Sequence, residues 1–184
     1  MTVKECMQLA AAHLGMEETV ETYFNGAGTV DDNKKCELLL TCYNIVENEL
    51  ALDYFPLIAE DTIDSEGGVI NFTSLKKDAV RITKVTDEWE NSVPFQIFPS
   101  YLKTQPGKVL VRYTYAPVKK TSTSASDFSS HVSARLISYG IAAEYTMATG
   151  FFEDASVWDK KYKESIRAAY RLQKCERIRS RRWV

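Results

Sequence analysis

The stretch Val109-Leu110-Val111-Arg112-Tyr113-Thr114-Tyr115 decides the fold class of this 184-residue chain. It follows the turn-forming pair Pro106-Gly107, it is rich in β-branched and aromatic residues, and its side chains alternate between two faces. A period of two is typical of a half-buried strand. The sequence therefore predicts a β-sheet in the middle of the chain.

Further short runs rich in Val, Ile, Tyr and Phe lie upstream of this strand, separated by Gly, Pro, Asn and Asp. They are Val69–Thr73, which follows Gly67-Gly68, and Val80–Val85 and Val93–Phe98. We expect four or five antiparallel strands within residues 57–116.

Trp89 lies in the polar tip Asp87-Glu88-Trp89-Glu90-Asn91, between two of these runs. An exposed Trp can anchor a partner, but a Trp in a hairpin can also fold back over the sheet. The sequence leaves both alternatives open.

Apolar residues recur with the helical period of 3.6 on both sides of the sheet region. The four predicted helices cover residues 2–15, 29–53, 131–149 and 154–175, and the first begins with a capping box of Thr2 and Glu5. The predicted fold is α+β, a four-helix bundle with an antiparallel β-sheet insertion between helices 2 and 3. Residues 1–56 and 127–175 form the bundle, 57–116 the insertion, 117–126 a Lys/Ser/Thr linker and 176–184 a flexible basic C-terminal tail.

Charge is distributed unevenly along the chain. Residues 1–66 contain fourteen Asp and Glu against three Lys, whereas residues 160–184 contain ten Lys and Arg against two Glu. The formal net charge of −2 conceals this separation. It is either an accident of solvated helix surfaces or a means of giving copies of the chain complementary faces for head-to-tail assembly.

Several functional classes find little support in the residues. No apolar run approaches the roughly 20 residues that cross a bilayer, and the amino terminus is unlike a signal peptide, so we expect a protein made in a cytoplasm without membrane contact. The four cysteines are scattered and are expected to be buried reduced thiols. His13 and His131 have no Cys or His partner at metal-ligand spacing. We therefore expect no enzyme, no catalytic residue, no cofactor and no metal site, and we assign Trp158 and Tyr162 to core packing.

Several motifs resemble the carboxyl-terminal half of head-to-tail adaptor (connector or neck) proteins of tailed bacteriophages. They are Ser138–Tyr145 (SYGIAAEY), Gly150–Ala155 (GFFEDA), Trp158–Lys163 (WDKKYK) and Ser180–Trp183 (SRRW). Asp32–Lys35, leading into Val46–Ala51, is similar to the same family. The resemblance covers about half of the chain and leaves the sheet region unmatched.

The resemblance implies a structural virion protein, assembled in the bacterial host cytoplasm into a ring, commonly a dodecamer, beneath the capsid portal. The ring joins the portal protein to the next neck or tail protein, and the double-stranded genome passes through its channel at ejection without sequence-specific binding. The carboxyl-terminal segment docks on the portal. On this chain the docking residues would be Arg177, Ile178, Arg179, Arg181, Arg182, Trp183 and Val184.

Two further contacts are predicted from the charge pattern and from the polar tip. Lys163, Arg167 and Arg171 are predicted at the interface between subunits, and Trp89 is predicted to contact a neighbouring copy or the next neck protein. The alternative is a nucleic-acid-binding protein that uses the basic final helix. Against it, the basic run is confined to one helix and its tail, no recognition motif accompanies it, and the acidic first third would repel phosphate.

Overall fold

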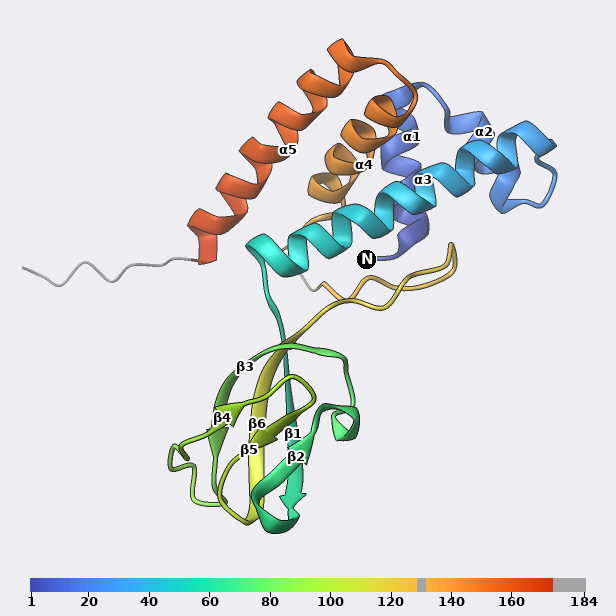
Figure 1. Cartoon of the computed structure of the whole chain (residues 1–184). Coiled ribbons are helices and arrows are strands. Elements are labelled where there is room, and N and C mark those ends of the chain that lie inside the picture. The colour runs from blue at the N-terminus through green and yellow to red at the C-terminus, as the bar shows by residue number, and fades with distance from the viewer. Residues whose placement is uncertain (129–131, 174–184) are drawn as a thin grey trace, which may run out of the picture. The chain divides into compact units, whose positions relative to one another are not determined.

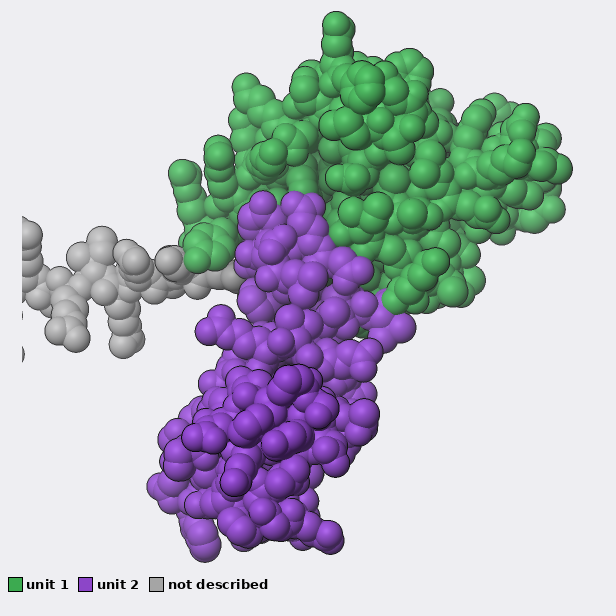
Figure 2. Space-filling model, in the orientation of Figure 1, with its two compact units in different colours: residues 1–47, 119–184 green, residues 48–118 purple. Residues whose placement is uncertain are grey.

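The computed structural model describes residues 1–128 and 132–173 (Figure 1). The chain divides into two compact units, coloured in Figure 2. Unit 1 comprises residues 1–47 and 119–184, and unit 2 comprises residues 48–118, so the predicted β insertion at residues 57–116 lies within unit 2. The portal-docking residues predicted in the tail lie outside the described residues.

Helices make up most of the described part of unit 1. They are α1 (Val3–Leu14), α2 (Glu17–Phe24), α3 (Val30–Glu49), α4 (Ala134–Ala148) and α5 (Phe152–Gln173). The predicted capping box is confirmed, because Thr2 Oγ1 accepts from the Glu5 N–H and the Glu5 carboxylate accepts from the Thr2 N–H. Gly15 ends α1 in the left-handed region, at φ 66°.

The prediction of a four-helix bundle is wrong, because the described residues contain five α-helices. The helix that the sequence did not reveal is α2. Val20 is its only buried residue, and its N-cap Met16 makes no side-chain hydrogen bond. A helix with so small an apolar face and no capping side chain gives no period of 3.6 to detect.

A close approach of three helices organises the core of unit 1. A Cβ built on Gly140 of α4 would lie 2.8 Å from Val46 Cγ1 of α3 and 2.9 Å from Tyr162 Cε2 of α5. Because those distances are shorter than normal carbon contacts, a side chain at position 140 would push the helices apart. Tyr162 is buried here, as predicted, whereas Trp158, for which core packing was also predicted, is half-buried.

Residues 119–127 are held against α3 by polar contacts. The Lys120 N–H donates to Asn44 Oδ1 (2.6 Å), and Asn44 Nδ2 donates to the Lys120 carbonyl (3.2 Å). Nearby, buried Glu47 accepts hydrogen bonds from the Tyr43 hydroxyl (2.9 Å), the Ser126 hydroxyl (2.7 Å) and the Asp127 N–H (3.1 Å). These bonds fix the residues that were predicted as a linker.

Unit 2 contains two three-stranded antiparallel sheets, so the prediction of a single sheet inserted in the bundle is wrong. Their orders are β1-β6-β3 and β2-β5-β4. The strands are β1 (Leu57–Ser65), β2 (Val69–Asn71), β3 (Ala79–Thr86), β4 (Gln96–Ile97), β5 (Tyr101–Lys103) and β6 (Gly107–Tyr115). The alternation predicted for the decisive stretch is confirmed, since Val109, Val111 and Tyr113 of β6 are buried and Arg112 is exposed.

Both sheets contribute to one apolar core. Ile70 of β2 and Leu102 of β5 belong to the same buried cluster as Val85 of β3 and Val111 of β6. Two short sheets therefore bury a common interior that neither could form alone.

A buried carboxylate secures a loop of unit 2. Asp61 of β1 accepts from the Tyr113 hydroxyl (2.7 Å) and from the Lys76 N–H (2.8 Å), and Lys76 Nζ lies 3.2 Å from its other oxygen. Burial opposes ionisation of Asp61, but these interactions together outweigh it and lower its pKa. These contacts compensate for the burial of a carboxylate in the acidic strand β1.

Candidate docking surfaces

The first candidate surface is the basic face of α5, which we define as Lys163, Arg167 and Arg171. The spacing of four residues puts these side chains on one side of the helix, and all three are exposed. Lys163 also bonds Asp159 one turn earlier, at 2.7 Å. Glu153 and Asp154 lie in the first turn of α5 and Arg171 in its last, so both ends complement the helix dipole.

Unit 1 also exposes an acidic face, formed by Glu17, Glu18 and Glu21 of α2. One folded unit thus carries surfaces of both signs. The charge asymmetry of the sequence is preserved on the folded surface of unit 1.

The second candidate surface is the acidic tip, residues Asp87–Asn91 of unit 2. The Asp87 carboxylate accepts from the Trp89 N–H (2.9 Å) and from both the N–H (2.8 Å) and the side-chain amide (3.0 Å) of Asn91. Desolvation opposes ionisation of Asp87, yet the bonds from Asn91 and Trp89 outweigh it and lower its pKa. Glu90 adopts a φ of 63°, which completes the turn.

Trp89 is 77% exposed on this tip. The structure therefore excludes the alternative in which Trp89 folds back over the sheet. The neighbouring Glu88 lies 3.6 Å from Lys108 Nζ, and both side chains are more than half exposed. The tip presents an indole among carboxylates on a backbone held by its own hydrogen bonds.

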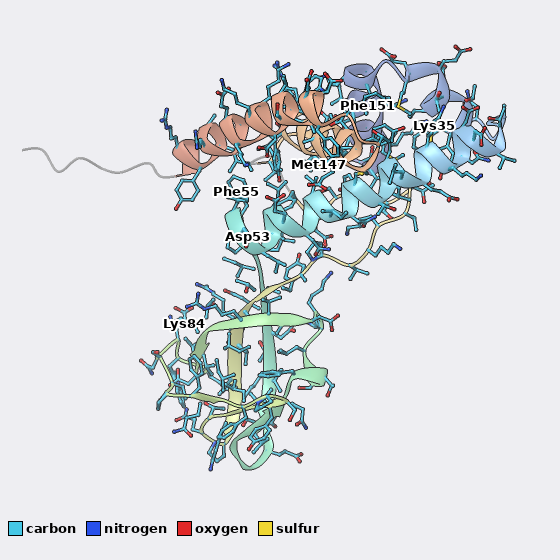
Figure 3. The ribbon with its side chains drawn as sticks, turned by 45° about the horizontal axis from the view of Figure 1, so that its top comes forward. Lys35, Asp53, Phe55, Lys84, Met147 and Phe151 are labelled. Carbon is cyan, nitrogen blue, oxygen red and sulfur yellow. The ribbon has the colours of Figure 1, made fainter. Side chains whose placement is uncertain are left out.

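The third candidate is a cavity of about 470 Å³ in unit 1. Its walls come from α1, α3, α4, α5 and the turns between helices, and include His13, Lys35, Thr149, Phe151, Asp154 and Trp158. Figure 3 labels Lys35 on α3 and Phe151 at the turn between α4 and α5. Phe151 is 62% exposed at the rim, and Lys35 and Asp154 give the lining charges of both signs.

His13, which lines this cavity, packs in a cluster of three mutually contacting aromatic rings with Tyr139 and Trp158. Its ring centre lies 5.0 Å from that of Tyr139 and 4.9 Å from that of Trp158, and Lys161 Nζ lies 4.2 Å from the Trp158 ring centre. Burial, then Lys161 and Arg135, lower the pKa of His13, so it is neutral at pH 7. His13 therefore contributes to the packing of unit 1.

The Ser138 hydroxyl orients the His13 ring. It donates to the Arg135 carbonyl at 2.8 Å, which leaves its oxygen to accept from His13 Nε2 at 3.2 Å. The ring is thus held by a hydrogen bond as well as by stacking.

The three cysteines in the described part of unit 1 are buried. Cys6, Cys36 and Cys42 are buried free thiols, as predicted, and burial raises their pKa values to about 12, 11 and 12. His131 and Cys175 lie outside the described residues. Among the residues that the structure describes, no three His, Cys, Asp or Glu side chains gather as metal ligands, and no helix is long and apolar enough to span a membrane.

Sequence reasoning identified two of the three surfaces. It found the basic face from the excess of basic residues in the final helix and the acidic tip from a Trp in a polar turn. The cavity was missed because its lining residues come from separate helices and form no motif. No protein-family model matches the chain, and no curated protein is similar enough to it to count as a relative.

Proposed function

We propose that this protein is a head-to-tail adaptor of a tailed bacteriophage, a structural virion protein that forms a ring beneath the portal. The ring joins the portal to the neck or tail and leaves a channel for the genome. The observation that carries the proposal is the exposed basic face of α5 in the same unit as the exposed acidic face of α2. Surfaces of opposite sign on one subunit favour a head-to-tail contact between copies, and such contacts form a ring when the rotation from one copy to the next closes.

Sequence outside the described residues adds support. Residues 176–184 contain four Arg together with Ile178, Trp183 and Val184. Apolar anchors among arginines suit a segment that orders on a partner, because charge alone does not offset about 1–2 kcal/mol of backbone entropy per ordered residue. We assign this segment to portal docking.

The proposal is tested by the mass of the purified full chain, alone and with the portal protein of the same phage. The wild-type chain should form a ring on the portal. The triple variant Lys163→Glu, Arg167→Glu, Arg171→Glu should lose ring formation while keeping its helical circular dichroism, because all three side chains are exposed. A ring of unchanged mass and salt sensitivity in the variant would exclude the electrostatic interface.

A matched control is available in unit 2. Arg81, Lys84 and Lys103 are exposed and belong to unit 2, whereas the basic face belongs to unit 1. Replacing all three by Glu changes the net charge by the same amount as the triple variant of the basic face. This variant should assemble like the wild type. An equal loss of assembly would mean that only net charge matters.

DNA binding is the second candidate, since the same exposed face of α5 suits phosphate. An electrophoretic shift at physiological salt separates the two functions. An adaptor should bind DNA weakly and the portal tightly. Tight binding to DNA and weak binding to the portal would favour the nucleic-acid-binding function.

A further inference from the structure

We propose that the acidic tip of one copy docks on the basic face of α5 in the next copy, with Trp89 as its anchor. This contact rests on the proposed function, in which copies of the chain assemble into a ring. It specifies which two surfaces of neighbouring copies meet. Neither surface was paired with the other by the sequence.

The tip is built to present its side chains without a large ordering cost. The Asp87 carboxylate already fixes the turn through the backbone N–H groups of Trp89 and Asn91, at 2.9 and 2.8 Å. Trp89 is 77% exposed between Glu88 and Glu90. A fixed loop that displays an aromatic residue loses little entropy on binding.

The basic face has the complementary chemistry. Residues four apart on a helix are about 6 Å apart along its axis, so Lys163, Arg167 and Arg171 form a row of about 12 Å. Tyr170, 43% exposed, adds aromatic surface next to Arg171. An Arg guanidinium can lie on the face of an indole while neighbouring cations bond the flanking carboxylates.

The tip suits this face better than α2 does. The acidic face of α2 offers three exposed carboxylates, but its aromatic residues Tyr23 and Phe24 are half-buried. Trp and Arg are the residues that most often dominate binding free energy at protein interfaces. The tip supplies the Trp and α5 the Arg.

A charge-swap rescue experiment shows whether the acidic tip or the acidic face of α2 contacts the basic face. The starting chain carries the triple reversal Lys163→Glu, Arg167→Glu, Arg171→Glu, and assembly is followed by the mass of the full chain at rising concentration, alone and on the portal. Adding Glu88→Lys and Glu90→Lys should restore assembly. Asp87 is left unchanged because it holds the turn.

Rescue by Glu17→Lys, Glu18→Lys and Glu21→Lys instead would overturn the inference and leave the proposed ring intact. Rescue by neither set would also overturn it. If the wild type forms no assembly even on the portal, the proposed function fails, and the docking contact fails with it.

Trp89→Ala in the otherwise natural chain tests the anchor. Removing a Trp side chain that is buried only when two copies meet should raise the dissociation constant between copies at least about tenfold. Ile97→Ala is the matched control, since Ile97 is 55% exposed in the same unit and outside the tip, and it should change the constant less than about twofold. Equal effects of the two substitutions would overturn the role of Trp89.

Discussion

Among the described residues, each unit contains one deeply buried carboxylate bonded to a Tyr hydroxyl, and the two are stabilised differently. Glu47 in unit 1 is 1% exposed and bonds Tyr43, Ser126 and the Asp127 N–H. Asp61 in unit 2 is 4% exposed and bonds Tyr113, the Lys76 N–H and the Lys76 ammonium group. Both carboxylates hold a loop on a regular element. Glu47 accepts hydrogen bonds from neutral groups, whereas Asp61 also forms an ion pair with Lys76.

The largest predicted effect is in unit 1. Glu47→Ala removes the acceptor of three donors, and leaving buried donors unsatisfied costs about 1–3 kcal/mol each. We expect the free energy of unfolding of unit 1 to fall by about 3–5 kcal/mol, measured by urea denaturation with helical circular dichroism.

Glu47→Gln is the control, because its amide oxygen can still accept hydrogen bonds. It should cost clearly less than the Ala variant. Equal losses would mean that the volume of the side chain, and not its acceptor, stabilises residues 119–127.

Asp61→Asn should have an intermediate effect, about 1–3 kcal/mol at pH 7. The pKa of Asp61 is lowered in the folded state, so its stabilisation is complete above the unfolded-state value of about 3.9 and is lost as pH falls through the folded-state pKa. The variant should therefore show a flatter acid unfolding curve for unit 2 below about pH 4. Parallel curves for the two proteins would show that Asp61 is not the titrating group.

The smallest effect concerns the ion pair that distinguishes the two carboxylates. The Lys76 side chain is 82% exposed, so Lys76→Met should cost less than about 1 kcal/mol, while the backbone N–H continues to donate to Asp61. High salt should reduce the stability of the wild type more than that of the variant, because the variant lacks this ion pair. A loss as large as that of Asp61→Asn would make the ammonium group, and not the hydrogen bonds, the main support of the carboxylate.

Sequence patterns predicted the elements that bury a whole face. The period of 3.6 identified α3, α4 and α5, and the period of two identified β6. The predictions failed where burial depends on distant partners. Strand β1 carries Glu60, Asp61 and Asp64, and none of the predicted strand runs includes it. In the fold, Tyr113 and Arg112 of β6 pair with its carboxylates.

The docking surfaces were predictable to different degrees. Predicting the basic face requires only three basic residues spaced four apart on one helix. The exposure of Trp89 depends on the hydrogen bonds of Asp87, which the composition of the turn does not reveal. The lining of the cavity depends on how several helices pack, which no local pattern encodes.

The bonds between Asn44 and Lys120 have a consequence for how the gene can change. They bring together the two points of unit 1 between which unit 2 is inserted, and within unit 2 the first and last strands pair from Leu57 with Tyr115 onward. Where the entry and exit of an insert are neighbours, its length alters the closure entropy of the host only slowly. Unit 2 can therefore diverge in sequence or be replaced by recombination while the helical unit 1 keeps its fold.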